Sequence, residues 1–304
     1  MEPVILYNSP YVPPEWIAAH GFRPMRPTPG SGDSAREILS AREGLCPWAR
    51  HFANAALSGP DTAGVVLGTT CDQIRRLRDI FASDAAIPFF LFHVPSVWQT
   101  ASAHALYLSE LDRLGRFLIA HGGRSPASAD LAAVMDRYDR ERRSMMDSVP
   151  RHAPAGNRPA IPIAFLGGDL TREDLALYAI VAECGGRVVL DGTETGTRVA
   201  PARFDRRRLA ADPLRELADA YFGTIPDVFR RPNSALFEWI RRETAQHAVR
   251  GAVLIRQVWC DLWHAESARI REWLSVPMLD LDRDGEPCRA RERTRIQAFV
   301  ESLQ

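Results

Sequence analysis

The chain has 304 residues, and its 38 basic residues balance its 38 acidic residues to a formal net charge of zero. With 46% apolar and 25% charged residues it has the composition of a globular protein, without the overall positive charge on which nucleic-acid and anionic-membrane binders rely. All of these basic residues are Arg and none is Lys. A Schiff-base lysine, a catalytic lysine base and a phosphate-loop lysine are therefore excluded.

The first half of the sequence predicts a parallel α/β domain that begins with an extended, Pro-rich segment. Residues 1–30 carry many turn signals and one short helix, 15–20, with Pro14 at its first position. The elements expected next are helices 34–43 and from 48 onward, strand 62–68, helix 72–81, strand 87–93, and helices 97–120 and 125–146. The continuous apolar run at 62–68 is typical of a strand buried on both faces.

The second half alternates strands and helices more regularly. The expected elements are strand 161–166, helix 171–183, strand 187–190, helices 213–221 and 234–247, strand 252–255, helix 264–273, strand 278–281 and helix 289–303. Strands separated by helices of this length form parallel sheets covered on both faces. We therefore expect an α/β protein of two Rossmann-like domains, each a short parallel sheet flanked by helices. Residues 148–160 hold three Pro and a Gly and are expected to link domain 1–150 to domain 151–304.

The sequence predicts a reducing compartment and no membrane contact. No apolar run reaches the roughly 18–20 residues that span a bilayer. The first ten residues lack the basic and apolar segments of a secretory signal, so we expect a cytoplasmic protein. Five Cys is an odd count in a chain large enough to fold without disulfides. In such a chain, cysteines more often mean a metal site, a reactive thiol or core packing.

A Cys-Asp pair occurs at the equivalent place in both halves. Cys71-Asp72 follows the apolar stretch GVVL, Cys260-Asp261 follows GAVL, and a Pro comes 17 residues after each cysteine. Ligands of open α/β sheets bind beyond the carboxyl ends of the strands, so both cysteines are expected to face one cleft between the domains. Helix N-termini favour the thiolate that binds metals, and we expect the two aspartates to accept N–H bonds at the helix starts.

The other cysteines differ in what their surroundings predict. Cys46, directly before Pro47, could join Cys71 and Cys260, whereas Cys184 and Cys288 are expected to be structural or ordinary thiols. Three widely spaced cysteines are by themselves a weak metal signal, because free Cys is commonly a small buried hydrophobe. The sequence has no CxxC, GxGxxG or GxSxG motif, which leaves a zinc knuckle, dinucleotide binding and a hydrolase elbow unsupported.

Four segments are more specific together than any one of them alone. They are YVPPEWIAAHGFRP at 11–24, LCP at 45–47 with Arg50, TTCD at 69–72 followed by Pro88 and Pro95, and VWCD at 258–261 followed by RTRIQAF at 293–299. With these segments, and with Gly196-Thr197-Arg198, the chain resembles the 2-hydroxyacyl-CoA dehydratase component D and benzoyl-CoA reductase subunit family over essentially its whole length. The resemblance implies a 4Fe–4S cluster held by Cys46, Cys71 and Cys260 in the cleft between the domains.

The resemblance also implies a function. The chain would be an iron–sulfur subunit that turns a CoA thioester into a ketyl radical, which expels a hydroxyl group or leads to ring reduction. A separate, ATP-hydrolysing iron–sulfur activator would deliver the electron. The subunit would pair with a related subunit or a second copy, and tryptophans near the cleft could contribute to that interface. They are Trp98, Trp259, Trp263 and Trp273.

Two questions stay open at this point. Glu15 matches the family's Pro-x-Glu position and is either an acid/base group near the substrate or an acid that favours the helix start. The chain could also be an electron-relay or supporting subunit without a substrate site of its own. A further alternative is a non-enzymatic α/β protein that uses its cysteines structurally.

Overall fold

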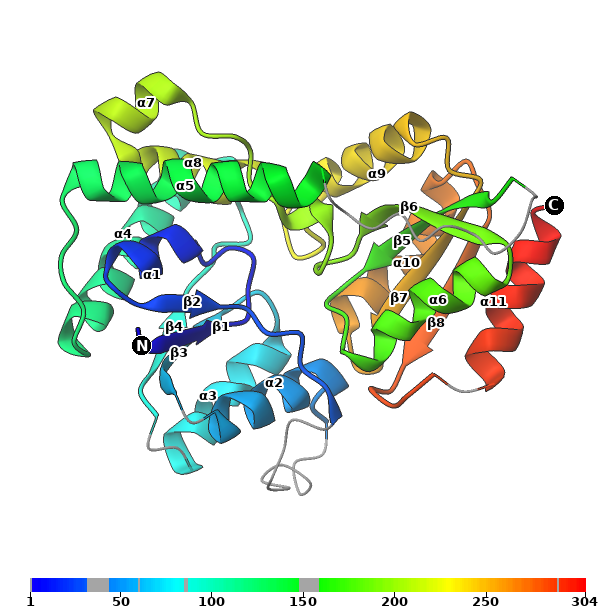
Figure 1. Cartoon of the computed structure of the whole chain (residues 1–304), viewed down its shortest axis with the longest axis horizontal. Coiled ribbons are helices and arrows are strands. Elements are labelled where there is room, and N and C mark those ends of the chain that lie inside the picture. Colours follow the sequence, from blue (N-terminus) through cyan, green and yellow to red (C-terminus); the bar gives the residue numbers. More distant parts are fainter. Residues whose placement is uncertain (1, 32–43, 60, 85–86, 148–158, 289) are drawn as a thin grey trace.

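The structure is a computed structural model that describes residues 2–31, 44–59, 61–84, 87–147, 159–288 and 290–304. Two α/β halves lie side by side, each built on a four-stranded, all-parallel sheet flanked by helices (Figure 1). The predicted fold class of two parallel α/β domains is confirmed. The expected helix 34–43 and most of the expected linker fall outside the described residues, and the division at residue 150 stays a prediction.

The first sheet has the strand order β2-β1-β3-β4. Its strands are β1 (Val4–Tyr7), β2 (Arg23–Met25), β3 (Thr62–Gly68) and β4 (Phe89–Phe92). The helices of this part are α1 (Pro14–Ala19), α2 (Pro47–Ser58), α3 (Asp72–Asp84), α4 (Ala101–Ala120) and α5 (Ser128–Asp147). The sequence pattern missed β1 and β2. The sheet tolerates Pro24 inside β2 because β2 is an edge strand.

The second sheet has the order β6-β5-β7-β8, with the same arrangement of first, second, third and fourth strands as the first sheet. Its strands are β5 (Ile161–Gly167), β6 (Gly186–Gly192), β7 (Gly251–Gln257) and β8 (Met278–Arg283). Around it lie α6 (Ala176–Glu183), α9 (Ser234–Gln246), α10 (Asp261–Trp273) and α11 (Ala290–Ser302). Because the topologies match, Cys71 and Cys260 follow equivalent strands, β3 and β7.

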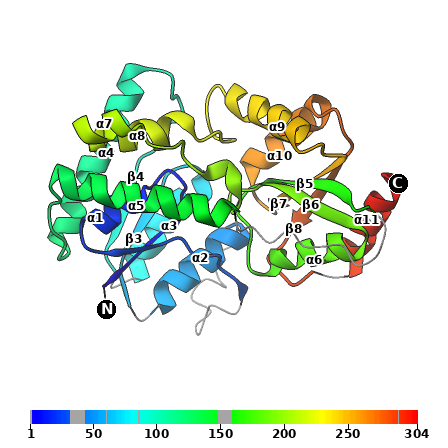
Figure 2. The same ribbon diagram turned by 45° about the horizontal axis from the view of Figure 1, so that its top comes forward.

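Two helices from the second half of the sequence pack against the first half of the molecule. α7 (Arg206–Ala211) and α8 (Pro213–Thr224) lie over α4 and α5 (Figures 1 and 2). Leu217 and Phe222 join the core that contains Tyr107, and the Tyr107 and Phe222 rings stack with centroids 4.8 Å apart. The chain therefore returns to its first core after it has built part of the second sheet. Among the described helices, none combines the length and the apolar character needed to cross a membrane.

Candidate functional site

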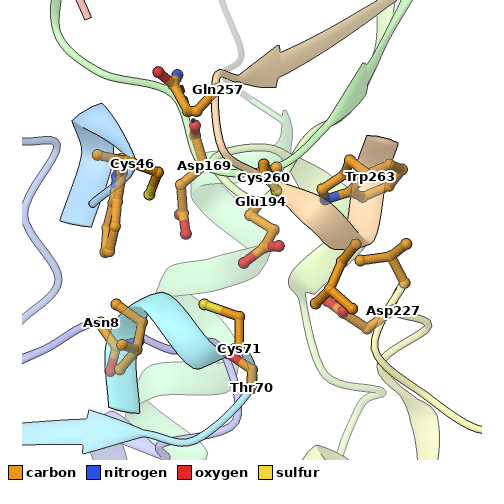
Figure 3. A pocket seen from close by; sticks show the side chains of 15 residues that line it. Asn8, Cys46, Thr70, Cys71, Asp169, Glu194, Asp227, Gln257, Cys260 and Trp263 are labelled. Carbon is orange, nitrogen blue, oxygen red and sulfur yellow. Dashed lines mark hydrogen bonds between the residues drawn. The ribbon is translucent and has the colours of Figure 1, made fainter. Parts of the chain in front are cut away.

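Three cysteines stand at the starts of three helices that meet at one pocket. Cys46 and Cys260 are the N-cap residues of α2 and α10, and Cys71 directly precedes α3. All three line the same pocket, to which both halves of the chain contribute residues (Figure 3). The structure thus brings together the three cysteines that the sequence singled out.

The buried thiols are held in their neutral form. Burial raises the pKa of Cys46 to about 11 and that of Cys260 to about 12, and it also raises the pKa of Cys71. Backbone N–H groups at the helix starts lower these pKa values in part. The Cys46 sulfur accepts a hydrogen bond from the Ala49 N–H at 3.4 Å, and the N–H three residues after Cys71 acts in the same direction. The corresponding N–H in α10 also faces the sulfur of Cys260, although this contact falls short of a capping hydrogen bond. A bound cation would offset the cost of burying negatively charged thiolates. The helix N-termini favour the thiolate form as well.

Two carboxyl groups lie among the cysteines. Asp169 and Glu194 follow β5 and β6, and Figure 3 shows their carboxyl groups among the side chains of Cys46, Cys71 and Cys260. Burial raises the pKa of both, against the opposing effect of Arg26. The sequence reading missed this pair, although both residues come directly after parallel strands, where ligands bind.

Arg198 holds the loops that carry these carboxyl groups. Its fully buried guanidinium donates to the carbonyl oxygens of Gly192 at 2.8 Å and Gly167 at 3.2 Å, which close β6 and β5. It also pairs with the Asp227 carboxylate at 3.1 Å. Gly196 makes the turn possible, because a Cβ at this position would stand 2.2 Å from the carboxyl carbon of Asp191. The Gly-Thr-Arg segment therefore fixes the two strand ends beside the pocket.

A second cavity, of about 530 Å³, opens on the same three cysteines. Its walls also include Arg75, His93, Arg231 and Trp259. Trp259 is 64% exposed and has a backbone φ of 67°, a conformation that a bulky residue rarely adopts and that is found preferentially at functional sites. A molecule bound in this cavity would have access to the thiols, while Asp169 and Glu194 belong to the described lining of the first pocket and not of this one.

Glu15 lies away from the cysteines. Its carboxylate is fully buried, pairs with the Arg142 guanidinium and accepts a hydrogen bond from the Tyr221 hydroxyl at 2.8 Å. It is absent from the described lining of both cavities. These contacts favour the structural alternative for Glu15 over the acid/base role.

The aspartates of the two Cys-Asp pairs do not cap their helices as expected. Each is the first residue of its helix, and the cysteine before it occupies the cap position. The Asp72 side chain is 89% exposed, with the Arg75 guanidinium 3.8 Å away. The expectation that these carboxylates accept the first backbone N–H bonds is therefore wrong for Asp72.

The remaining candidates are distributed over the molecule. Cys184 and Cys288 pack against the core of the second sheet and do not appear in the described walls of either cavity. Trp263 is buried in the second core, so its ring is not available to a partner subunit, whereas Trp259 and Trp273 are exposed.

The fold and the pocket define a class of protein: two parallel-sheet domains with three thiols at the helix starts between them. The sequence profile of the family described as 2-hydroxyglutaryl-CoA dehydratase, D-component, matches residues 10–159 and 146–303. These segments cover nearly the whole chain, so the chain belongs to this family of dehydratase components, as the sequence motifs indicated. A search among curated proteins finds no match.

The pocket residues can be tested against an iron–sulfur cluster. Within the described ranges, no three His, Cys, Asp or Glu side chains are placed to hold a metal ion. A cubane cluster binds each cysteine through a different iron, so its thiols stand farther apart than the ligands of one ion. Cysteine thiolates are the usual ligands of such clusters. In the same pocket, the buried Nε1–H of Trp263 has no partner among the described residues, and a sulfur atom would satisfy it. The donor set therefore fits a cluster.

Proposed function

We propose that this chain is the iron–sulfur subunit of a 2-hydroxyacyl-CoA dehydratase or benzoyl-CoA reductase-type enzyme. Cys46, Cys71 and Cys260 would hold a 4Fe–4S cluster in the pocket between the domains. The observation that carries this proposal is the meeting of three cysteine-headed helix starts at one pocket, in a chain of the dehydratase D-component family. When bound, the cluster would supply one low-potential electron for ketyl-radical chemistry on a CoA thioester.

The protein groups around the thiols have separate tasks in this proposal. The partly positive helix ends stabilise negative charge at the thiolates, and burial keeps water from the site. Burial raises the pKa values of Asp169 and Glu194, so these carboxyl groups favour a proton beside the thiols. We assign the acyl end of the thioester to the second cavity, because this cavity opens on the three thiols.

This second cavity favours a substrate-binding subunit over a subunit that only relays electrons. A relay needs a buried redox centre and a docking surface, but no space of about 530 Å³ that opens on the ligating thiols. We further propose that an ATP-dependent iron–sulfur activator delivers the electron and that the chain pairs with a related subunit or a second copy. A reducing cytoplasm suits a protein whose cysteines are free thiols.

The test is anaerobic purification, with reconstitution by iron and sulfide, of wild-type protein and single Cys→Ser variants. The wild type is expected to be brown and to hold about four iron atoms per chain, as a cubane cluster requires. C46S, C71S and C260S should each lose most of this iron, whereas the matched controls C184S and C288S should retain it. Wild-type protein that binds no iron, or a set of pocket variants that all stay fully loaded, would overturn the proposal.

The enzymatic part needs a separate measurement. Loaded protein, its activator, ATP and a reductant should convert at least one member of a panel of 2-hydroxyacyl-CoA and aryl-CoA thioesters. Release of water identifies a dehydratase, and a reduced ring identifies a reductase. If the activator is shown to reduce the loaded protein while every thioester of the panel stays unchanged, that result would favour the electron-relay function.

A further inference from the structure

Trp263 presents an unused hydrogen-bond donor to the cysteine pocket. It stands on the first turn of α10, three residues after Cys260, and is 1% exposed. Its Nε1–H has no acceptor among the described residues. Figure 3 shows the indole nitrogen on the edge of the ring that faces Cys260 and Glu194. An unsatisfied buried donor destabilises the folded state, so native proteins keep few of them.

The surrounding packing fixes the direction of this N–H. The Arg198 guanidinium lies 5.2 Å from the centre of the indole ring. Gly168 also approaches the indole so closely that a Cβ there would stand 3.2 Å from Nε1. Other tryptophans of the chain satisfy their N–H groups within the protein: Trp16 donates to the Leu111 carbonyl oxygen at 2.8 Å, and Trp273 donates to that of Phe237 at 3.0 Å. The donor of Trp263 is thus directed at the site and is not used for packing.

We propose that the Trp263 indole N–H donates a hydrogen bond to a sulfur atom of the bound cluster, either a sulfide or a ligating thiolate. This bond would raise the reduction potential of the cluster. This inference rests on the proposed function. Reduction increases the negative charge on the sulfur atoms, so a fixed donor stabilises the reduced state more than the oxidised state. Without the N–H, the cluster would be harder to reduce.

The experiment compares W263F with wild-type protein after both are loaded with iron and sulfide. W263F keeps an aromatic ring for Arg198 and removes only the donor and part of the ring. We expect unchanged iron content and a reduction potential shifted to more negative values in a spectroelectrochemical titration. The matched control is W273F on the same helix, which loses its bond to Phe237 outside the pocket and should keep the wild-type potential.

Replacement of Trp263 by 3-benzothienylalanine provides a second variant if W263F fails to fold or to load. This residue has the shape of tryptophan and lacks the N–H, so it should show the same negative shift. An unchanged potential in a normally loaded variant overturns the inference and leaves the proposed function intact. Wild-type protein that binds no iron instead overturns the proposed function, and this inference with it.

Discussion

Asp169 and Glu194 are carboxyl groups beside the cysteines that bind protons more tightly in the folded chain than in the unfolded chain. Burial raises both pKa values, most strongly that of Glu194. A group whose pKa is raised on folding stabilises the folded state at pH values below its unfolded pKa. This stabilisation is lost as the pH rises from that value through the folded pKa, at about 1.4 kcal/mol for each unit of difference.

We therefore expect the metal-free wild-type protein to melt at a lower temperature at pH 8 than at pH 6. Because Glu194→Gln removes the group with the stronger pKa shift, this variant should show a smaller pH dependence, whereas the exposed control Glu238→Gln should behave as the wild type. Thermal unfolding by circular dichroism measures both. A wild-type protein whose melting temperature rises across this interval would show that the pair is fully ionised when folded.

Glu15 is predicted to stabilise the first domain through a buried ion pair. Glu15→Gln leaves the Arg142 guanidinium without its counter-charge, and breaking such a pair destabilises a protein by about 3 kcal/mol. Urea unfolding should show this loss, and the iron content of the loaded variant should not change. The double variant Glu15→Gln, Arg142→Met should regain part of the stability. Full stability of Glu15→Gln together with lost turnover would instead establish the acid/base role.

The residues of the site were predictable to different degrees. Cys71 and Cys260 could be found because strand, Cys-Asp and helix recur at matching spacing in the two halves, whereas Cys46 lies outside this repeat and joins the set through the family resemblance. The burial of Glu15 could not be found, because its partners Arg142 and Tyr221 are distant in the sequence and meet it only after α5 and α8 pack together. Asp169 and Glu194 carry a positional signal at the strand ends, but nothing local indicates that burial raises their pKa values.

At the scale of elements, the cysteines replace the usual capping residues. An N-cap cysteine sulfur is a weaker acceptor than a Ser or Asp oxygen, so three helix starts give up capping strength while their sulfur atoms face a common pocket. The exposed aspartate at the first position of α3 adds only a favourable interaction with the helix dipole.

Asp72→Ala should accordingly lower the free energy of unfolding by no more than about 0.5 kcal/mol and leave the iron content unchanged. Cys71→Ser, one residue earlier, should lose most of the iron while it keeps a competent cap. Chemical denaturation and iron analysis of the two variants separate these effects. Loss of iron in Asp72→Ala would mean that the carboxylate organises the cysteine loop after all.

Strands and helices could be predicted where their burial requires a recognisable pattern of apolar residues. The third strand of each sheet, β3 and β7, is a continuous apolar run because helices cover both faces. The three residues of β2 carry no such run, since this edge strand is largely open to solvent. The helix α7 is six residues long and depends on packing against α5. Its Arg-rich sequence gives no sign of this packing.

At the scale of the whole molecule, Arg26 joins the two halves next to the pocket. It donates to the Asn8 carbonyl oxygen at 3.0 Å on one side, and on the other to the Glu194 carbonyl oxygen at 2.8 Å and the Asp169 carboxylate at 2.6 Å. The residue lies just beyond β2, in the segment where the sequence showed only turns and prolines.

Arg26→Ala should lower the free energy of unfolding by roughly 2–3 kcal/mol, because it removes hydrogen bonds to a charged group and leaves Asp169 less compensated. Loaded protein should also release iron to a chelator faster than wild type. Arg241→Ala, at an exposed pair with Glu238, is the control and should change neither property. Equal rates of iron release in all three proteins would show that the contacts of Arg26 do not hold the pocket together.

The return of α7 and α8 to the first core has a consequence for dissecting the protein into fragments. A piece that ends at residue 150 would lack Leu217 and Phe222, and the apolar side chains of α4 that these residues cover, including Tyr107, would be exposed to water. Such a piece should aggregate on expression, and the complementary piece would carry two amphipathic helices without a surface to cover. A first-half fragment that folds independently would need α7 and α8 joined to it by a new linker. We therefore expect evolution to keep this component as one continuous chain.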